Sequence, residues 1–505
     1  MAASASEACP VVLVSGFLGP NNEAWCERYW GEAAALSTQK SPVLVVPVSC
    51  VGSALDRACE MFARILGTRV DYGEAHAAEA GHARFGKDYT GSAAYAAWSA
   101  EHPIHVVGHS FGGNTVRVFK YLVATDYFGV GTSAAWVRST TTLSSPLKGS
   151  LLTYKLGASE DHNESKPVHR FSPGYMLGLS VHFYELFCHK TGLDAFFDFG
   201  MSQWNVEEKG LKFFLYSLLG GSNGGGTPAV CARDNAAHDM TIQAAFEWNE
   251  RIAQAVAKDP HHTEFNFVAN KKNLLNYSLV GNTRELFRPR SVTSLSSGSS
   301  TTASHSGSEI DSDSDDDDYS IAAAANTDIP RQVGEPVARL SEAKEAALLL
   351  ASDDVAPIEG AAAAAATTAA APATEESSFL WRGTLFLRDF WVYHLAKRVF
   401  ASKYAIEFAE KHHEDAFSVK EYIESGGDGL CNAFAQFESN STLREEDLDA
   451  AHRKLGFAPG QYTVLMNERH DHFSVVPFPD STTDQREFFQ RLFRTLRNVQ
   501  CPPLI

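Results

Sequence analysis

The chain of 505 residues carries 61 acidic residues against 43 Lys and Arg, a formal net charge of −18. At roughly 100–200 residues per domain, this length predicts about two to four domains, or one large enzyme domain with insertions. The acidic balance excludes a typical binder of nucleic acid or of anionic membranes, because both partners require a basic surface.

The first 150 residues predict a buried, mostly parallel sheet. Short apolar runs at Val11–Val14, Val43–Val46, Ile104–Val107 and Ala135–Leu143 alternate with longer helical stretches. The first run stops at Ser15, which makes it too short for the apolar region of a signal peptide. No run approaches the ~18 apolar residues of a membrane span. We therefore expect a cytoplasmic protein without a transmembrane segment.

Ser110 is the candidate nucleophile. It stands in Gly-His-Ser-Phe-Gly, between the strand predicted at Ile104–Val107 and a helix predicted from about Thr115. Strand, tight turn and helix are the context of a nucleophile elbow, in which Gly108 and Gly112 avoid collisions with neighbouring backbone. The alternative is a glycine-rich turn with a buried or capping serine.

An oxyanion hole for this nucleophile needs two backbone N–H donors. Phe111 follows the serine and supplies the first donor. The second should come from a loop after an early strand, and Gly16–Gly19 fits, with Phe17 as the donor. The alternative for this loop is an ordinary glycine-rich turn.

Further along, an aromatic-rich stretch at 171–214 predicts either a core helix or a lid over the site. A helix is predicted at 240–257, and a strand around Phe265 and Phe267. Near the C-terminus, Tyr462–Met466 predicts a strand and 482–498 an amphipathic helix.

The segment 288–378 differs from the rest of the chain, with 16 acidic and only 5 basic residues. Its low hydrophobicity and high charge predict a disordered acidic and alanine-rich insert. It would divide the core into a first part, 1–287, and a second part, 379–505. The insert is either a loop without function or a regulatory segment. Ser308, Ser312 and Ser314 each have an acid three residues on, a pattern typical of acidophilic kinase sites.

The chain resembles the bacterial thermoalkaliphilic lipases, a branch of the α/β-hydrolases with an inserted zinc-binding subdomain. The resemblance implies an α/β fold with a mostly parallel central sheet, a small metal subdomain and a helical lid in 171–214. It covers about the first 150 residues almost continuously and is patchy beyond them. The matching segments are SGF at 15–17, DRACE at 56–60, DYG at 71–73, HAA at 76–78, GHARFG at 81–86 and GHS at 108–110.

The resemblance also implies the partners of Ser110. Gly427-Asp428-Gly429 is similar to the segment that carries the family's acid, so Asp428 would orient the base. Asp-Gly is also a common turn pair, which leaves a turn aspartate as the alternative. His472 takes the position of the catalytic base, with His470 as its rival and a surface histidine as the alternative for either. Within this triad His472 would accept the Ser110 proton.

A structural zinc site is the second feature that the resemblance implies, with Asp56, His76 and His82 as three of four ligands. The fourth ligand in the family is an aspartate directly before Gln-Trp, but in this chain Ser202 stands at that position. Water or an acid such as Asp198 would therefore complete the site. The alternative is a subdomain that folds without metal. Ser474 replaces the family's calcium-binding glutamate, and no calcium is expected there.

The resemblance implies hydrolysis of carboxylic esters of lipids, such as triacylglycerols, through an acyl-enzyme on Ser110. The alternatives are a short-chain esterase or acyltransferase with the same triad, or an inactive hydrolase fold that acts as a binding protein. Acyl chain length, headgroup and oligomeric state do not follow from the sequence.

Overall fold

The computed structural model describes residues 9–159, 167–193, 197–211, 233–269, 431, 436, 442–444, 462–467, 472–476 and 483–499, with a few single residues excepted inside these ranges. All of them belong to one compact unit formed by residues 1–287 and 382–505. The predicted insert at 288–378 lies outside the described residues, as do its three serines. The division into two core parts and an insert stays a prediction.

Seven strands of the described chain form one sheet, in which every neighbouring pair is parallel. The sheet has the order β2-β1-β5-β6-β7-β9-β8. Its strands are β1 (Val11–Val14), β2 (Val43–Val45), β5 (Ile104–His109), β6 (Val137–Leu143), β7 (Glu264–Ala269), β8 (Thr442–Arg444) and β9 (Tyr462–Asn467). The α/β fold class predicted from the short apolar runs is thereby confirmed.

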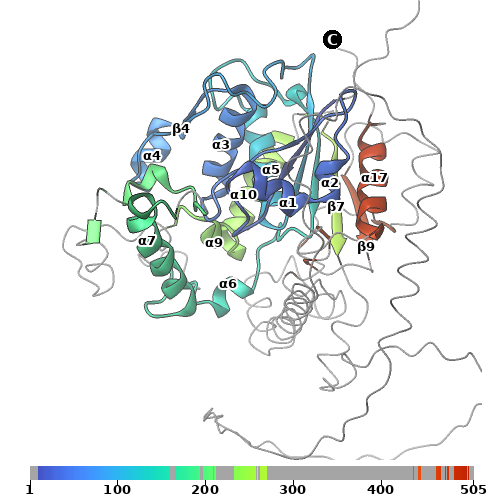
Figure 1. The fold of residues 1–505 in the computed structure, drawn as a ribbon. Coiled ribbons are helices and arrows are strands. Elements are labelled where there is room, and N and C mark those ends of the chain that lie inside the picture. The colour runs from blue at the N-terminus through green and yellow to red at the C-terminus, as the bar shows by residue number, and fades with distance from the viewer. Residues whose placement is uncertain are drawn as a thin grey trace, which may run out of the picture. The chain divides into compact units, whose positions relative to one another are not determined.

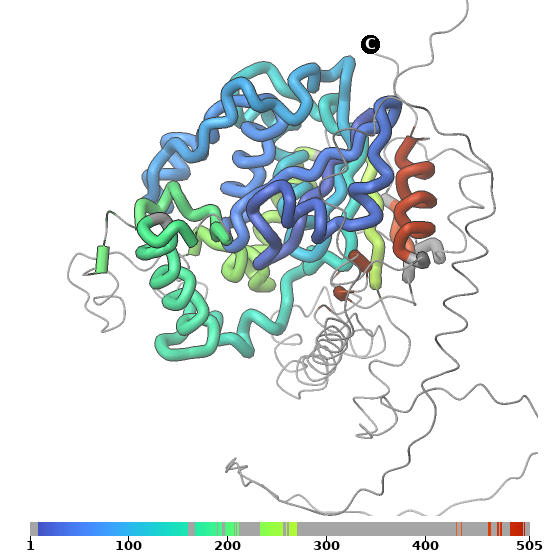
Figure 2. Tube along the Cα trace, viewed as in Figure 1, coloured from blue at the N-terminus to red at the C-terminus, as the bar shows by residue number. Residues whose placement is uncertain are grey.

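Helices cover both faces of this sheet, because alternate side chains of each strand point to opposite faces. Val12 and Val106 pack against α3 (Ala54–Leu66), α5 (Phe111–Ala124) and α10 (Ile242–Val256). Leu13 and Val107 instead face α1 (Glu23–Trp30), α2 (Glu32–Ala35) and α17 (Thr483–Arg497). Figure 1 shows these two helical layers. In Figure 2, the blue N-terminal segment and the red α17 lie side by side, and α2 contacts α17.

A small subdomain follows α3 in the sequence. It contains an antiparallel pair, β3 (Arg69–Asp71) and β4 (Phe85–Asp88), with α4 (Glu74–Ala80) between the strands. The Ser53 side chain caps the N-terminus of α3 by accepting from the Asp56 N–H, and Gly67 ends the helix in a left-handed conformation. These caps fix where α3 begins and ends, and they place Asp56 in its first turn.

The aromatic-rich stretch contains α7 (Pro173–Thr191), which begins with a Ser172 cap and a proline in its first turn. Leu179, Val181 and Leu186 are buried, whereas Met176 and Phe183 are nearly half exposed. The helix therefore packs against the protein on one side and exposes apolar side chains on the other. The remaining short elements are η1 (Ala134–Trp136), α6 (Leu152–Lys155), η3 (Ser202–Trp204) and α9 (Ala236–Asp239). Among the described helices, none combines the length and apolar character needed to cross a membrane.

Candidate active site and metal centre

Ser110 occupies a strained turn at the carboxyl edge of the sheet. It lies between β5 and α5 with φ 55° and ψ −132°, a left-handed backbone that is unfavourable for a non-glycine residue. A Cβ at position 108 would lie 2.1 Å from the Gly112 carbonyl oxygen, and one at position 112 would lie 2.4 Å from the Val14 carbonyl oxygen. Only glycine fits at either position. The strand, the tight turn and the helix that the sequence predicts around Ser110 are all present.

His472 lies directly beside this serine. Its Nε2 is 2.9 Å from Ser110 Oγ, although the two residues are 362 positions apart in the sequence. The His472 side chain is buried. Asp428 and the rival His470 lie outside the described residues. The arrangement brings a base and a hydroxyl within hydrogen-bond distance at a strained turn, the geometry of an activated serine.

A chain of hydrogen bonds holds the backbone of His472. Its carbonyl oxygen can only accept, so His109 Nε2, 2.9 Å away, must be the donor. Burial holds the pKa of His109 well below its usual range, so His109 is neutral and its Nδ1 accepts. The donor to Nδ1 is the Tyr29 hydroxyl, whose oxygen in turn accepts from the Gly16 N–H at 3.4 Å. Strand β5 thus fixes the loop that carries His472.

The loop at Gly16–Gly19 lies against Ser110. A Cβ at Gly16 would be 2.7 Å from Ser110 Cβ and 3.2 Å from its Oγ. Phe111 is fully buried and is the first residue of α5, so its N–H belongs to the unpaired N-terminal donors of that helix. Gly16 and Ser110 are in contact, and each is followed directly by one of the predicted donor residues, Phe17 and Phe111. Both predicted N–H donors therefore belong to backbone close to Ser110.

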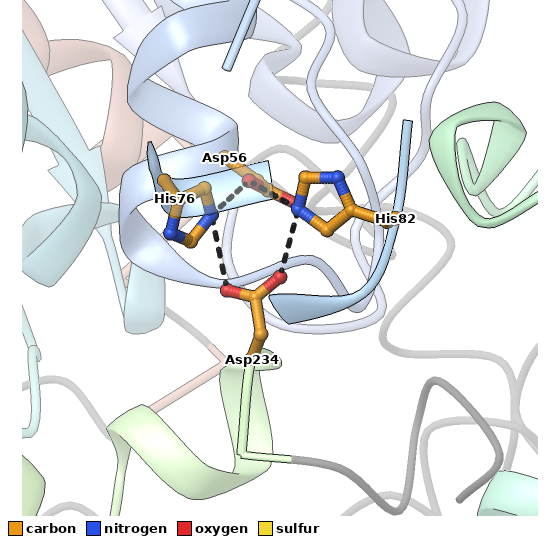
Figure 3. Close-up of side chains that lie close together, drawn as sticks. All are labelled: Asp56, His76, His82 and Asp234. Carbon is orange, nitrogen blue, oxygen red and sulfur yellow. Dashed lines mark hydrogen bonds and ion pairs between the residues drawn. The ribbon is translucent and has the colours of Figure 1, made fainter. Parts of the chain in front are cut away.

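The second group comprises Asp56, His76, His82 and Asp234, whose ligand atoms lie within 4.8 Å of one another. Figure 3 shows the two imidazoles and two carboxylates converging on one point. His76 Nε2 lies 2.9 Å from Asp56 Oδ1 and 3.5 Å from Asp234 Oδ1. His82 Nε2 lies 3.6 Å from Asp56 Oδ1 and 3.3 Å from Asp234 Oδ2. Ligands about 2.0–2.1 Å from a tetrahedral zinc ion would be about 3.3 Å apart, so the spacing suits such an ion.

The protonation pattern of the group also suits a cation. His82 Nδ1 lies 2.8 Å from the Ala83 carbonyl oxygen, so Nδ1 carries a proton and Nε2 is the ligand atom. Burial raises the pKa of Asp56, but hydrogen bonds from His76 and His82 outweigh it and lower that pKa to about 2. Gln203 Nε2 donates to the second oxygen of Asp56 at 3.0 Å and fixes its orientation. The four side chains can therefore bind a metal ion.

The fourth member corrects the sequence prediction. Asp198 was the candidate acid, but its backbone oxygen accepts from Cys50 Sγ and its Oδ1 from the Gly200 N–H, outside the group. Asp234 completes the group instead, so no open position has to be filled by water. Sequence reasoning missed it because the expected place was Ser202, and a single aspartate before a short helix carries no distinguishing signal. Ser474, on which the prediction of no calcium depends, lies outside the described residues.

A family model described as "Lipase-like, C-terminal domain" matches residues 7–278, more than half of the chain. A Staphylococcus epidermidis lipase is 29% identical over an alignment of 268 residues, and the match covers 48% of this chain and 36% of that protein. Lipase 2 of Staphylococcus aureus is 30% identical over an alignment of 265 residues, and the match covers 48% of this chain and 35% of that protein. The chain thus spans about a third of the length of the curated relatives it matches.

Comparison with a solved structure supports the fold. The crystal structure of Staphylococcus hyicus lipase, 14% identical in sequence, matches with a TM-score of 0.54 over 99% of this chain and 98% of that one. At this identity the likeness concerns the α/β-hydrolase fold alone. Together with the family match, it confirms the resemblance to bacterial lipases that the sequence predicts.

Proposed function

Because the chain belongs to the family described as "Lipase-like, C-terminal domain", we propose that it hydrolyses carboxylic esters of lipids with Ser110 as nucleophile. The observation that carries the proposal is the 2.9 Å separation of His472 Nε2 and Ser110 Oγ at a strained strand–helix turn. Both the ester hydrolysis and the triacylglycerol-like substrate are proposals.

In the proposed reaction the Ser110 hydroxyl donates to His472 Nε2, which takes the proton as the oxygen attacks the ester carbonyl. The tetrahedral oxyanion is bound by the N–H groups of Phe17 and Phe111. The imidazolium returns its proton to the alcohol that leaves, and an acyl-Ser110 ester remains. Water, deprotonated by His472, then attacks this ester and releases the acid.

Asp428 is proposed as the residue that orients His472. The support comes from its described neighbours, because Gln436 accepts from the Ala269 N–H at 3.0 Å and donates to the Cys431 carbonyl at 3.3 Å. Ala269 is the last residue of β7, so Cys431 is linked to the carboxyl edge of the sheet, where Ser110 also lies. The three Cα-to-Cα steps from residue 428 to residue 431 span at most about 11 Å, so Asp428 belongs near that edge.

Zinc is proposed as the ion of the metal centre, with Asp56, His76, His82 and Asp234 as its ligands. Two imidazoles and two carboxylates match the nitrogen and oxygen ligands that zinc accepts. Four protein ligands close a tetrahedral site, which is typical of a structural ion. When bound, the ion would hold together α3, the segment around α4 and the chain before α9, without taking part in the ester chemistry.

A lipid rather than a small soluble ester is proposed because of α7. Its outer side exposes Met176, Leu177, Phe183 and Phe187, each between 38% and 49% exposed. Exposed apolar side chains grouped on one helix are typical of a surface that contacts other apolar matter. In this proposal α7 is the lid over the active site.

The test is labelling by a fluorophosphonate and turnover of p-nitrophenyl esters of increasing chain length. We expect wild-type protein to be labelled at Ser110 and to prefer long acyl chains, and Ser110→Ala to lose both properties. Ser144, a buried serine with φ 52° at the end of the neighbouring strand β6, provides the matched control Ser144→Ala, which should still be labelled.

Each alternative gives a different result in the same experiment. Activity confined to short chains would indicate an esterase, and transfer of the acyl group to an added alcohol in preference to water would indicate an acyltransferase. An unlabelled wild-type protein without turnover would refute the proposal and favour a binding protein.

A further inference from the structure

We propose that Arg57 is a positioning residue that orients the oxyanion loop, defined as Ser15–Gly19, and connects it to the helix that carries the metal ligand Asp56. The inference rests on the proposed function, because it assigns a catalytic purpose to that loop. Arg57 lies in the first turn of α3, and its side chain is fully buried. Burying a charged group without hydrogen-bond partners is costly, so the contacts of the Arg57 guanidinium indicate its role.

The guanidinium contacts both halves of the proposed oxyanion hole. Arg57 Nη2 donates to the Ser15 carbonyl oxygen at 2.5 Å, and Nη1 donates to the Gly16 carbonyl oxygen at 3.4 Å. Its central carbon lies 5.1 Å from the centre of the Phe111 ring, within cation–π range. One side chain thus holds two consecutive peptides of the loop and packs on the residue that follows the nucleophile.

These contacts set the direction of the loop's N–H groups. In a planar trans peptide, the carbonyl of one residue and the N–H of the next point in opposite directions. The Ser15–Gly16 peptide follows this rule, since its oxygen faces Arg57 and its N–H faces the Tyr29 hydroxyl. It is therefore held from both sides.

The next peptide carries the proposed donor. The Gly16 carbonyl oxygen accepts from Arg57 and also from the Gly19 N–H at 3.1 Å, which uses both of its lone pairs. The Phe17 N–H must consequently point away from Arg57. Since Gly16 itself lies against Ser110, this orientation leaves the Phe17 N–H available to an oxyanion on the acylated serine.

The loop needs such support because it contains strain. Leu18, although not glycine, has φ 56°, and its N–H donates to the Cys50 carbonyl oxygen at 2.8 Å. Residues in this region of backbone space cost about 1–3 kcal/mol and persist only where their surroundings impose them. Arg57 supplies that constraint from the side of α3. A lysine in its place would offer one ammonium group instead of a planar fork, and could not hold two carbonyls in a fixed geometry.

The same helical turn carries the metal centre. Asp56 immediately precedes Arg57, and its carboxylate is fixed by His76 at 2.9 Å and by Gln203 at 3.0 Å. A change in the metal centre that moves the first turn of α3 therefore moves Arg57 and the loop it holds. The structure assigns to Arg57 the physical link between the metal centre and the active site.

The first experiment replaces Arg57 by Met and by Lys, with Arg64→Met as the matched control. Arg64 lies on the same helix but donates to the Ser92 carbonyl and to the Glu23 carboxylate, away from the loop. Because a small misplacement of catalytic groups can cost about 100-fold in rate, we expect kcat of Arg57→Met to fall about 10–100-fold, with KM within about threefold. Binding of an alkylboronic acid, measured by calorimetry, should weaken in parallel with kcat/KM.

Each outcome decides the proposal. Arg57→Lys should recover part of the boronic acid affinity, and Arg64→Met should match the wild type. Unchanged boronic acid affinity in Arg57→Met, or equal losses in Arg57→Met and Arg64→Met, would overturn it. If Arg57→Met does not fold, the Arg57→Lys comparison takes its place. Failure of the proposed function itself is distinguishable, because wild-type protein would then not bind the boronic acid or be labelled at Ser110.

A second experiment tests the link to the metal centre by combining Arg57→Met with His82→Ala. In the wild-type background, His82→Ala should release the metal and weaken boronic acid binding. In the Arg57→Met background it should add little, because connected residues give non-additive effects. Fully additive losses would show that the metal centre does not act through Arg57.

Discussion

Replacing Asp234 by Ala should abolish metal binding and lower the thermal stability of the protein. Asp234 supplies one oxygen 3.5 Å from His76 Nε2 and the other 3.3 Å from His82 Nε2, so its loss opens the ligand set on one side. A ligand that is present at about 100–1,000 times its Kd stabilises the native state by about 2.7–4.1 kcal/mol. For a domain of this size, loss of that term corresponds to a fall in Tm of about 5–15 °C.

The effect should depend on pH, because protons compete with the metal for the histidines. Burial lowers the pKa of His82, but hydrogen bonds that His82 donates to Asp234 and Asp56 outweigh it and raise the pKa to about 10 without metal. The pKa of His76 is raised as well, against burial, by its hydrogen bond with Asp56. In the metal-free protein both histidines stabilise the fold below about pH 6.5. The contribution of His82 is lost as pH rises through about 10, and that of His76 is lost as pH rises through its own raised pKa. Metal affinity, and the Tm difference due to metal, should therefore increase between pH 6.5 and 10.

The assay is metal analysis of purified protein together with thermal unfolding, with and without a chelator, at pH 7 and pH 9. Asp198→Ala is the matched control, because this aspartate lies outside the group. Wild type and Asp198→Ala should contain near-stoichiometric metal, and chelation should lower their Tm. Retention of the metal by Asp234→Ala would refute the prediction. A wild-type Tm that the chelator leaves unchanged at both pH values would refute it as well.

Two further predictions concern buried hydrogen bonds. His109→Phe removes the donor to the His472 carbonyl, so kcat should fall about 10–100-fold with little change in KM, as misplacement of a catalytic group predicts; steady-state kinetics equal to those of the wild type would contradict this role. Glu264→Gln removes the carboxylate 3.1 Å from the buried Arg117 and should cost about 3–5 kcal/mol at pH 7 in urea unfolding. Burial raises the pKa of Glu264, but Arg117 and His262 lower it from 4.5 to about 2. The wild-type advantage should therefore be complete above pH 4.5 and disappear as pH falls through about 2. A pH-independent difference would be inconsistent with that ion pair.

Several features of the site were predictable because their signals are local. The elbow around Ser110 needs glycines at positions 108 and 112, and both are explained by contacts with backbone within the same strand–turn–helix unit or its neighbour strand. The helices predicted at 240–257 and 482–498 are observed at Ile242–Val256 and Thr483–Arg497. In these cases the periodicity of apolar residues and the demands of one tight turn carry the information.

Other features depend on chain segments that meet only in the folded protein. The sequence motif around Asp56, His76 and His82 indicated a metal centre, yet its fourth carboxylate comes from Asp234, more than 150 residues after His82. No spacing rule connects these positions, because the sheet and α9 bring them together. The role of His109 was hidden in the same way, since nothing in Gly-His-Ser shows that its imidazole reaches the His472 backbone.

By itself, the sequence determined the fold class and the tight turn at Ser110, because apolar periodicity and glycine positions are features of neighbouring residues. The resemblance to bacterial lipases added His472 and three members of the metal group. The tertiary structure alone decided that Asp234 closes the metal group, that His109 donates to the His472 carbonyl and that Arg57 contacts the loop at Ser15–Gly19. The physical reason is that the carboxyl ends of parallel strands lie at the same edge of the sheet, whatever the order of the strands in the chain. Hydrogen-bonding groups from distant segments therefore converge there, at distances that no local pattern records.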